Sequence, residues 1–168
     1  MGRLCKCDAL CEKAKMNTPS SRQDIMQYLL EAAAEAAAQG EVPVAAAVTD
    51  AEGHMIALAR NSMRAHGNAL HHAEILALQA AMEHLGRDRL DGCDLWVTLE
   101  PCTMCAGAIA YARIRRLYFG ARDPKAGAVE SGVRFFDSAS CHHRPEIYGG
   151  LSERAAAAQL QAFFAARR

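Results

Sequence analysis

Two short motifs, His72-Ala73-Glu74 and Pro101-Cys102-Thr103-Met104-Cys105, constrain this chain more than any other feature. Each is followed by apolar residues at helical spacing, so each is predicted to open a helix. Cys102 and Cys105 are three residues apart, and side chains with that spacing leave one face of a helix as neighbours. A fold that unites the motifs must therefore place two helix N-termini side by side.

The residue types in these motifs indicate a catalytic zinc site with one ion per chain. His72, Cys102 and Cys105 offer three ligands, and a tetrahedral zinc with three protein ligands keeps its fourth position for water. Unpaired N–H groups in the first turn of a helix favour the two thiolates. Glu74 is suited to carry protons beside the activated water. The alternatives are a structural zinc, which would normally have a fourth protein ligand, or two inert core cysteines.

The composition is that of one globular domain. The chain has 168 residues, half of them hydrophobic, and no apolar run of eighteen residues, so no membrane span is expected. The N-terminus lacks an apolar segment of the secretory type, and we place the protein in the cytoplasm. The formal net charge is zero, but residues 101–168 carry ten Lys and Arg against five acids. That half could bind a polyanion, although an ordinary solvated surface has the same composition.

The first twenty residues differ from the rest. Cys5, Cys7 and Cys11 are crowded with charged residues, and no fourth metal ligand follows nearby. We therefore expect residues 1–20 to be a disordered tail, with Met16 as a candidate start, and residues 21–168 to form a single zinc-dependent domain.

The remaining pattern alternates helices and strands. Ser21 and Asp24 have the spacing of a capping box, and Pro101 fits the first turn of a helix. Helices are predicted near residues 22–39, 72–85, from 101 and at 151–166, and strands near 42–48, 54–59, 95–99 and 115–121, with a short helix and strand within 122–150. This order predicts an α/β layered domain, a central sheet of about five strands flanked by helices.

From residue 25 onward the chain resembles the bacterial tRNA-specific adenosine deaminases, which convert the wobble adenosine of a tRNA anticodon to inosine. The H-x-E…P-C-x-x-C pattern marks zinc-dependent nucleoside and base deaminases in general. Further similar segments are EVPV at residues 41–44, VTLEPCTMCA at 97–106, GARDPKAGA at 120–128 and the terminal FF and RR pairs.

The resemblance implies a three-layer α/β/α cytidine-deaminase-like fold with a mixed sheet, a homodimer, and an active site shared across the dimer. It also implies that an anticodon stem-loop is bound. The residues that it assigns to substrate binding are Asn61, which would hydrogen-bond the base, together with Asp123, Lys125, Phe163, Phe164, Arg167 and Arg168.

Three positions depart from the family pattern. Ala45 stands where the family usually has glycine, and His71 stands where it usually has a small residue. The loop at residues 67–70 lacks the family's Asp-Pro-Thr. These departures concern the substrate pocket and leave the zinc chemistry unchanged.

The leading hypothesis is zinc-dependent hydrolytic deamination of adenosine in a tRNA anticodon loop, where an unpaired base is reached at little unstacking cost. The first alternative is a free nucleobase or nucleoside deaminase of the guanine or cytosine type, which has no use for Lys125 or for a basic C-terminal helix. The second is a catalytically silent RNA- or partner-binding module, against which the retention of Glu74 with all three ligands argues.

Overall fold

The computed structural model describes residues 21–167. The expected tail 1–20, with its three cysteines and Met16, and the predicted RNA contact Arg168 lie outside the described residues. In chain order the elements are α2 (Arg22–Ala38), β1 (Ala45–Thr49), β2 (Met55–Arg60), α3 (Met63–His66), α4 (Ala73–Leu85), β3 (Asp94–Leu99), α5 (Thr103–Ala112), β4 (Arg116–Ala121), the 3₁₀ turn η2 (Phe135–Asp137), β5 (Glu146–Tyr148) and α6 (Glu153–Ala165).

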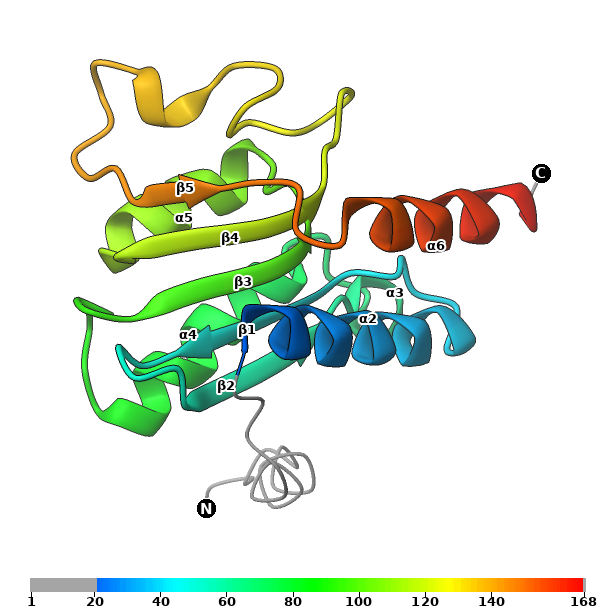
Figure 1. The fold of residues 1–168 in the computed structure, drawn as a ribbon, viewed down its shortest axis with the longest axis horizontal. Helices are drawn as coiled ribbons and strands as arrows, with labels where there is room; N and C mark the ends of the chain where they lie inside the picture. Colours follow the sequence, from blue (N-terminus) through cyan, green and yellow to red (C-terminus); the bar gives the residue numbers. More distant parts are fainter. Residues whose placement is uncertain (1–20, 168) are drawn as a thin grey trace.

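The five strands form one mixed sheet in the order β2-β1-β3-β4-β5 (Figure 1). β1 pairs antiparallel with both β2 and β3, whereas β3, β4 and β5 run parallel. Parallel neighbours need crossover connections, and α5 provides the one between β3 and β4. The ends of β3 and β4 therefore meet at one edge of the sheet, from which the chain enters α5 and the loop after β4.

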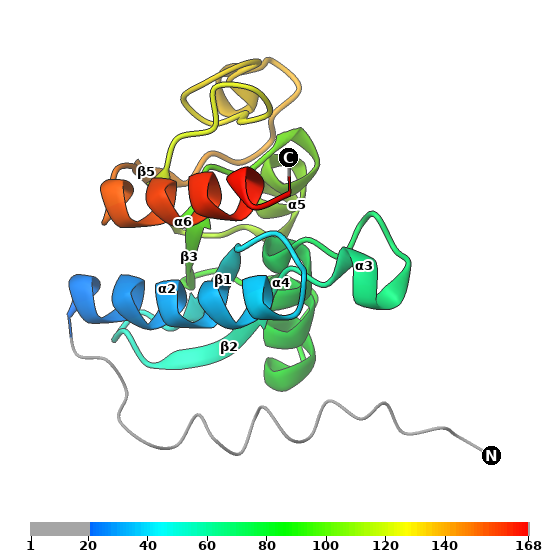
Figure 2. The same ribbon diagram turned by 90° about the vertical axis from the view of Figure 1, so that its right-hand side faces the viewer.

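Helices cover both faces of the sheet, with α2 and α6 on one side and α4 and α5 on the other (Figures 1 and 2). A large apolar cluster fills the space beneath α4 and α5, and a second one, which includes Trp96 and Tyr118, lies under α2. All five residues of β1 are buried, as expected for a strand covered on both faces. The three-layer α/β/α prediction is thus confirmed.

The start of α2 follows the sequence closely. The Ser21 hydroxyl accepts a hydrogen bond from the Asp24 N–H, and the Asp24 carboxylate accepts one from the Ser21 N–H, which completes the predicted capping box. Its buried side includes Ile25, Met26 and Leu29. Gly40 then adopts a φ of +85°, a conformation that glycine takes without strain, and the chain turns toward β1.

Three predicted boundaries were wrong. Pro101 lies outside α5, because the extended backbone at Cys102 bridges to Gly127 and the Pro101 carbonyl accepts from the Ala128 N–H. β1 begins at Ala45 and not near residue 42, since the Val44 N–H bonds locally to the Val42 carbonyl. Residues 61–70, which belong to none of the predicted helices or strands, contain the short helix α3.

Within residues 21–167, no helix is both long enough and apolar enough to cross a membrane.

Candidate active site

His72, Cys102 and Cys105 converge where α4 and α5 begin. His72 immediately precedes α4, Cys102 immediately precedes α5, and Cys105 lies in the first turn of α5. Nδ1 of His72 is 3.7 Å from Sγ of Cys102 and 3.5 Å from Sγ of Cys105. The structure therefore brings together the three residues that the sequence predicts as ligands.

These separations fit one tetrahedral zinc ion. Zinc binds sulfur at about 2.3 Å and nitrogen at about 2.0 Å, so tetrahedral ligand atoms stand about 3.5–3.8 Å apart. The two nitrogen–sulfur distances fall in this range, and all three candidate ligand atoms lie within 4.8 Å of one another. Three protein donors leave a fourth position for water or substrate, which is typical of catalytic zinc sites.

The charges of the two thiols are coupled. The hydrogen bond with Cys105 and the contact with His72 lower the pKa of Cys102 to about 4. The same contact with Cys102, together with burial, raises the pKa of Cys105. In the absence of a cation the pair therefore shares one negative charge, and a divalent cation is the kind of partner that makes a second thiolate favourable.

Glu74 lies on the first turn of α4, two residues beyond His72, and only 4% of its surface is exposed. Burial raises the pKa of its carboxyl group, which is the direction that suits a group that both takes and gives a proton near neutral pH. Its carboxyl group interacts with the side chains of His72, Cys102 and Cys105, so it lies beside the three candidate ligands.

Asn61, the predicted base contact, follows β2 and is 6% exposed. Its Nδ2 donates to Oε2 of Glu41 at 3.2 Å, and Oε1 of Glu41 accepts from the Ala65 N–H at 2.8 Å. Glu41 is itself only 3% exposed. The sequence analysis assigns no role to Glu41, although a glutamate directly before a predicted strand is a signal that could have identified it.

Glu100, at the end of β3, organises the loop that carries Asp123 and Lys125. Its buried carboxylate accepts five hydrogen bonds, from the backbone N–H groups of Asp123, Val129, Glu130 and Ser131 and from the Ser131 hydroxyl. A Cβ atom on Gly127 would stand 2.5 Å from the Glu100 carboxyl carbon, so the loop packs directly on this group. The sequence analysis also assigns no role to Glu100, because its hydrogen-bond partners lie more than twenty residues away along the chain.

Asp123 and Lys125 differ in what they present to a ligand. Oδ1 of Asp123 accepts from the N–H groups of Lys125 and Ala126, so this carboxylate shapes its own turn. The Lys125 side chain is exposed. The loop thus offers a cation at a site fixed to Cys102 through the bridge with Gly127.

The predicted RNA contacts on α6 are divided between core and surface. Phe163 is 6% exposed, whereas Phe164 is 51% exposed. The Arg167 guanidinium lies 3.5 Å from the centre of the Phe163 ring and donates to the Phe163 carbonyl. Of this group, Phe164 and Arg167 are the described side chains that stand at the surface.

Of the residues that depart from the family pattern, Ala45 packs under α2 and His71 adjoins the candidate site. Ala45 is fully buried in β1, where its N–H donates to the Thr98 hydroxyl. His71 precedes the candidate ligand His72, and its ring centre is 5.0 Å from that of His66. Within residues 21–167, Nδ1 of His71 is buried without a hydrogen-bond partner.

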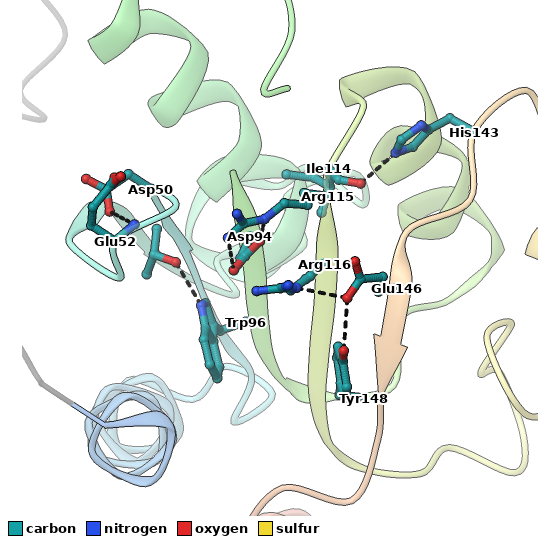
Figure 3. A network of polar contacts seen from close by, with 11 residues as sticks. Asp50, Glu52, Asp94, Trp96, Ile114, Arg115, Arg116, His143, Glu146 and Tyr148 are labelled. Carbon is teal, nitrogen blue, oxygen red and sulfur yellow. Dashed lines mark hydrogen bonds and ion pairs between the residues drawn. The ribbon is translucent and has the colours of Figure 1, made fainter. Parts of the chain in front are cut away.

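A separate polar network occupies the far end of β3 on the α2 face (Figure 3). Asp94 holds Arg115 with two hydrogen bonds of 2.8 Å, and Trp96 donates to Thr49. The adjoining cavity of about 540 Å³ is lined by residues of α2, the β1–β2 turn, β3 and β4, and by none of the candidate ligands. A further group of possible ligands, Asp50, Glu52 and His54, stands in that turn. We interpret the network as a structural link between strand ends.

Comparisons with known proteins identify the family of this chain. The family model of MafB19-like deaminases matches residues 20–168. The tRNA-specific adenosine deaminase of Agrobacterium fabrum is 50% identical over 149 residues, which are 89% of this chain and 97% of that protein. The protein of the same name from Bacillus subtilis is 37% identical over 83% of this chain and 86% of its own length.

Two kinds of solved structure share the fold. A chain from work on A-to-I editing by tRNA:A34 deaminases at the wobble position of transfer RNA has a TM-score of 0.81 and 51% identity, and the match covers 83% of this chain and all of that one. A guanine deaminase from Nitrosomonas europaea has a TM-score of 0.79 and 27% identity, and the match covers 94% of this chain and 93% of that one. The fold alone therefore does not identify the substrate. Sequence identity distinguishes the two kinds of structure, because it is 51% to the first and 27% to the second.

Proposed function

The chain belongs to the family of bacterial tRNA-specific adenosine deaminases and is a hydrolytic deaminase, and we propose that it converts adenosine to inosine at the wobble position of a tRNA anticodon. The observation that carries this proposal is the cluster of His72, Cys102 and Cys105 with the buried carboxyl of Glu74 beside it. Identity of about 50% to tRNA-acting relatives, against 27% to a guanine deaminase, supports the choice of substrate. Such a substrate places the activity in the cytoplasm.

One zinc ion per chain is held by His72, Cys102 and Cys105, as the ligand separations support. When bound, zinc supplies Lewis-acid activation of water at neutral pH. The helix starts that carry His72 and Cys102 stabilise negative charge at the site through their free N–H groups.

Glu74 moves the protons of the reaction. Hydrolytic deamination consumes one water and releases one ammonia, so a proton must pass from water to a ring nitrogen and another to the departing amine. The raised pKa of Glu74 supports this double role, because it is the direction in which a carboxylate holds a proton more readily before it passes it on. Asn61, held by Glu41, hydrogen-bonds the flipped-out nucleotide.

The anticodon stem-loop is bound by the loop after β4 and by α6. Lys125 and Arg167 contact phosphates, and the exposed Phe164 offers a ring for stacking. Arg168 joins Arg167 at the terminus, while Asp123 supports the loop and Phe163 supports α6. The excess of cations after residue 100 agrees with this arrangement.

The protein acts as a homodimer. The support is a face formed by α4 and α5, where Ile75, Met82 and Tyr111 line a cavity of about 240 Å³ and Tyr111 is 78% exposed. Pairing through this face would bring a second chain close to the helices that begin at the candidate ligands. Sedimentation of the purified chain at twice its monomer mass is the expected result.

Incubation with total tRNA or with an anticodon stem-loop, followed by nucleoside analysis, tests the proposed function. We expect inosine from the parent protein and at least about 100-fold slower inosine formation by Glu74→Gln prepared in the same way. Free guanine, cytosine and adenosine are incubated in parallel. Efficient turnover of a free base with no inosine in tRNA would refute the proposal in favour of a nucleobase deaminase.

A further inference from the structure

Both oxygens of the Glu41 carboxylate are occupied by N–H donors that come from beyond β2. Oε2 accepts from Nδ2 of Asn61 at 3.2 Å, and Oε1 accepts from the backbone N–H of Ala65 at 2.8 Å. Both hydrogen bonds lie in the protein interior, since Glu41 is 3% and Asn61 is 6% exposed. A buried carboxylate is normally retained only where such donors satisfy it.

This pairing fixes which end of the Asn61 amide faces outward. A carboxylate oxygen only accepts hydrogen bonds, so the amino end of the amide must face Glu41 and Oδ1 must point away. Within residues 21–167, Oδ1 of Asn61 accepts no hydrogen bond. It is also not one of the side-chain atoms that are fully buried without a hydrogen-bond partner. Solvent, and hence a ligand, therefore reaches this oxygen.

The backbone places Asn61 beside the candidate metal ligands. The next residue, Ser62, donates its N–H to the carbonyl of His71 at 3.1 Å. His71 directly precedes His72, which faces the two cysteines. The free oxygen of Asn61 thus belongs to a short loop tied to the start of α4.

We propose that Glu41 is a positioning residue that locks the Asn61 amide so that its oxygen accepts a hydrogen bond from the substrate. The inference rests on the proposed function, which puts Asn61 against the bound nucleotide. The partner on the substrate is a neutral N–H or O–H donor, such as the exocyclic amino group of adenine or a ribose hydroxyl. Glu41 touches neither and acts only through Asn61.

Glu41→Gln is the diagnostic change, because it alters hydrogen bonding with almost no change in shape. The glutamine oxygen can still accept from the Ala65 N–H, but its amino end then faces Asn61. Asn61 relieves the clash of two donors by rotating its amide through half a turn, and the amino group then faces the substrate. We expect kcat/KM to fall about 10- to 100-fold, while zinc content and Tm stay close to those of the parent.

The exchanged pair, a double variant that combines Glu41→Gln with Asn61→Asp, should restore activity. The glutamine amino end donates to one oxygen of Asp at position 61, and the second oxygen of that carboxylate again faces outward as an acceptor. Every donor near position 41 has a partner, and the charge of the pair is unchanged. A role confined to stability would not produce this rescue.

The experiment compares kcat/KM on an adenosine-containing anticodon stem-loop for four proteins: the parent, Glu41→Gln, the exchanged pair and Glu52→Gln. Glu52→Gln is the control, because it makes the same substitution at an exposed residue of the β1–β2 turn. We expect the exchanged pair to be at least about 10-fold more active than Glu41→Gln, with the control equal to the parent. Parent-like activity of Glu41→Gln, or a folded exchanged pair no more active than it, would overturn the proposal.

Two further arms keep the outcomes separate. If Glu41→Gln does not fold, the exchanged pair decides the matter by itself, because a folded but inactive pair refutes the role of the outward-facing acceptor. If the parent ignores the stem-loop but deaminates guanine, the proposed function has failed. The same four proteins are then compared on guanine, whose ring and amino N–H groups are donors of the required kind.

Discussion

Replacing Glu100 with glutamine should loosen the loop that joins Cys102 to Lys125. The best glutamine orientation keeps its oxygen toward the three N–H groups of Val129, Glu130 and Ser131 and turns its amino end toward the Asp123 N–H. The Asp123 N–H then loses its acceptor, at a cost of about 1–3 kcal/mol, and the Ser131 hydroxyl must turn to accept from the amino group. The three remaining bonds to a charged group become neutral ones. We expect the free energy of unfolding to fall by about 2–4 kcal/mol in total.

Thermal unfolding provides the assay. In a domain of this size 1 kcal/mol corresponds to about 2–4 °C, so Tm of Glu100→Gln should fall by about 5–15 °C at pH 7. Glu146→Gln is the matched control, because its partners Arg116 and Tyr148 are at the surface and an exposed ion pair contributes about 0–1 kcal/mol. Equal Tm values for the two variants would refute the reasoning.

The pH dependence of the same difference is a second check. Burial alone would raise the pKa of Glu100, but hydrogen bonds from Ser131, Asp123 and Glu130 lower it below its usual range. A lowered pKa means that the carboxylate stabilises the fold above the pKa of the unfolded chain, near 4.5, and that this stability is lost as the pH falls toward the folded value. The difference in Tm between the parent and Glu100→Gln should therefore shrink below about pH 4.5. A constant difference from pH 7 to pH 4 would show that the charge of Glu100 contributes nothing.

Three other changes test the candidate site and the proposed RNA-binding surface. Cys102→Ala and Cys105→Ala should each reduce zinc from about one per chain to near zero and lower Tm, because metal binding is coupled to folding; elemental analysis that finds full occupancy in both would sink the ligand assignment. Glu74→Gln should keep its zinc and its Tm while losing about 10²–10⁴-fold in turnover, since an amide cannot carry protons; near-normal turnover would mean that another group moves the proton. Arg167→Ala combined with Arg168→Ala should weaken tRNA binding and reduce the slope of log K against log salt by about 1–2 without changing zinc content; an unchanged slope would place the phosphate contacts elsewhere.

The local elements of the fold follow from short stretches of sequence. The capping box at Ser21 starts α2 as predicted, because both of its hydrogen bonds join residues three apart. The alternation of strands and helices predicted the layered architecture for a similar reason, since each element must bury its own apolar side. The boundary at Pro101 could not be predicted in this way, because a bridge from Cys102 to Gly127, twenty-five residues later, holds that backbone extended.

The C-terminal helix α6 is a second case in which the sequence alone does not predict the structure. Phe163 and Phe164 are neighbours in the sequence and look equally suited to stacking on a base. The structure buries the first and exposes the second, because successive side chains of a helix point in different directions and only one can face the sheet. Which of the two faced inward depended on how α6 packs beside β4.

The sequence by itself predicted the chemistry of this protein: the three candidate ligands and the proposed proton carrier lie within two motifs, each short enough to be read directly. Only the tertiary structure decided what holds that chemistry in place. Glu41 and Glu100 are buried carboxylates whose partners lie 20 to 31 residues away along the chain. A carboxylate can be buried only where several N–H groups converge on it, and that convergence arises from the folded backbone and leaves no periodic trace in the sequence.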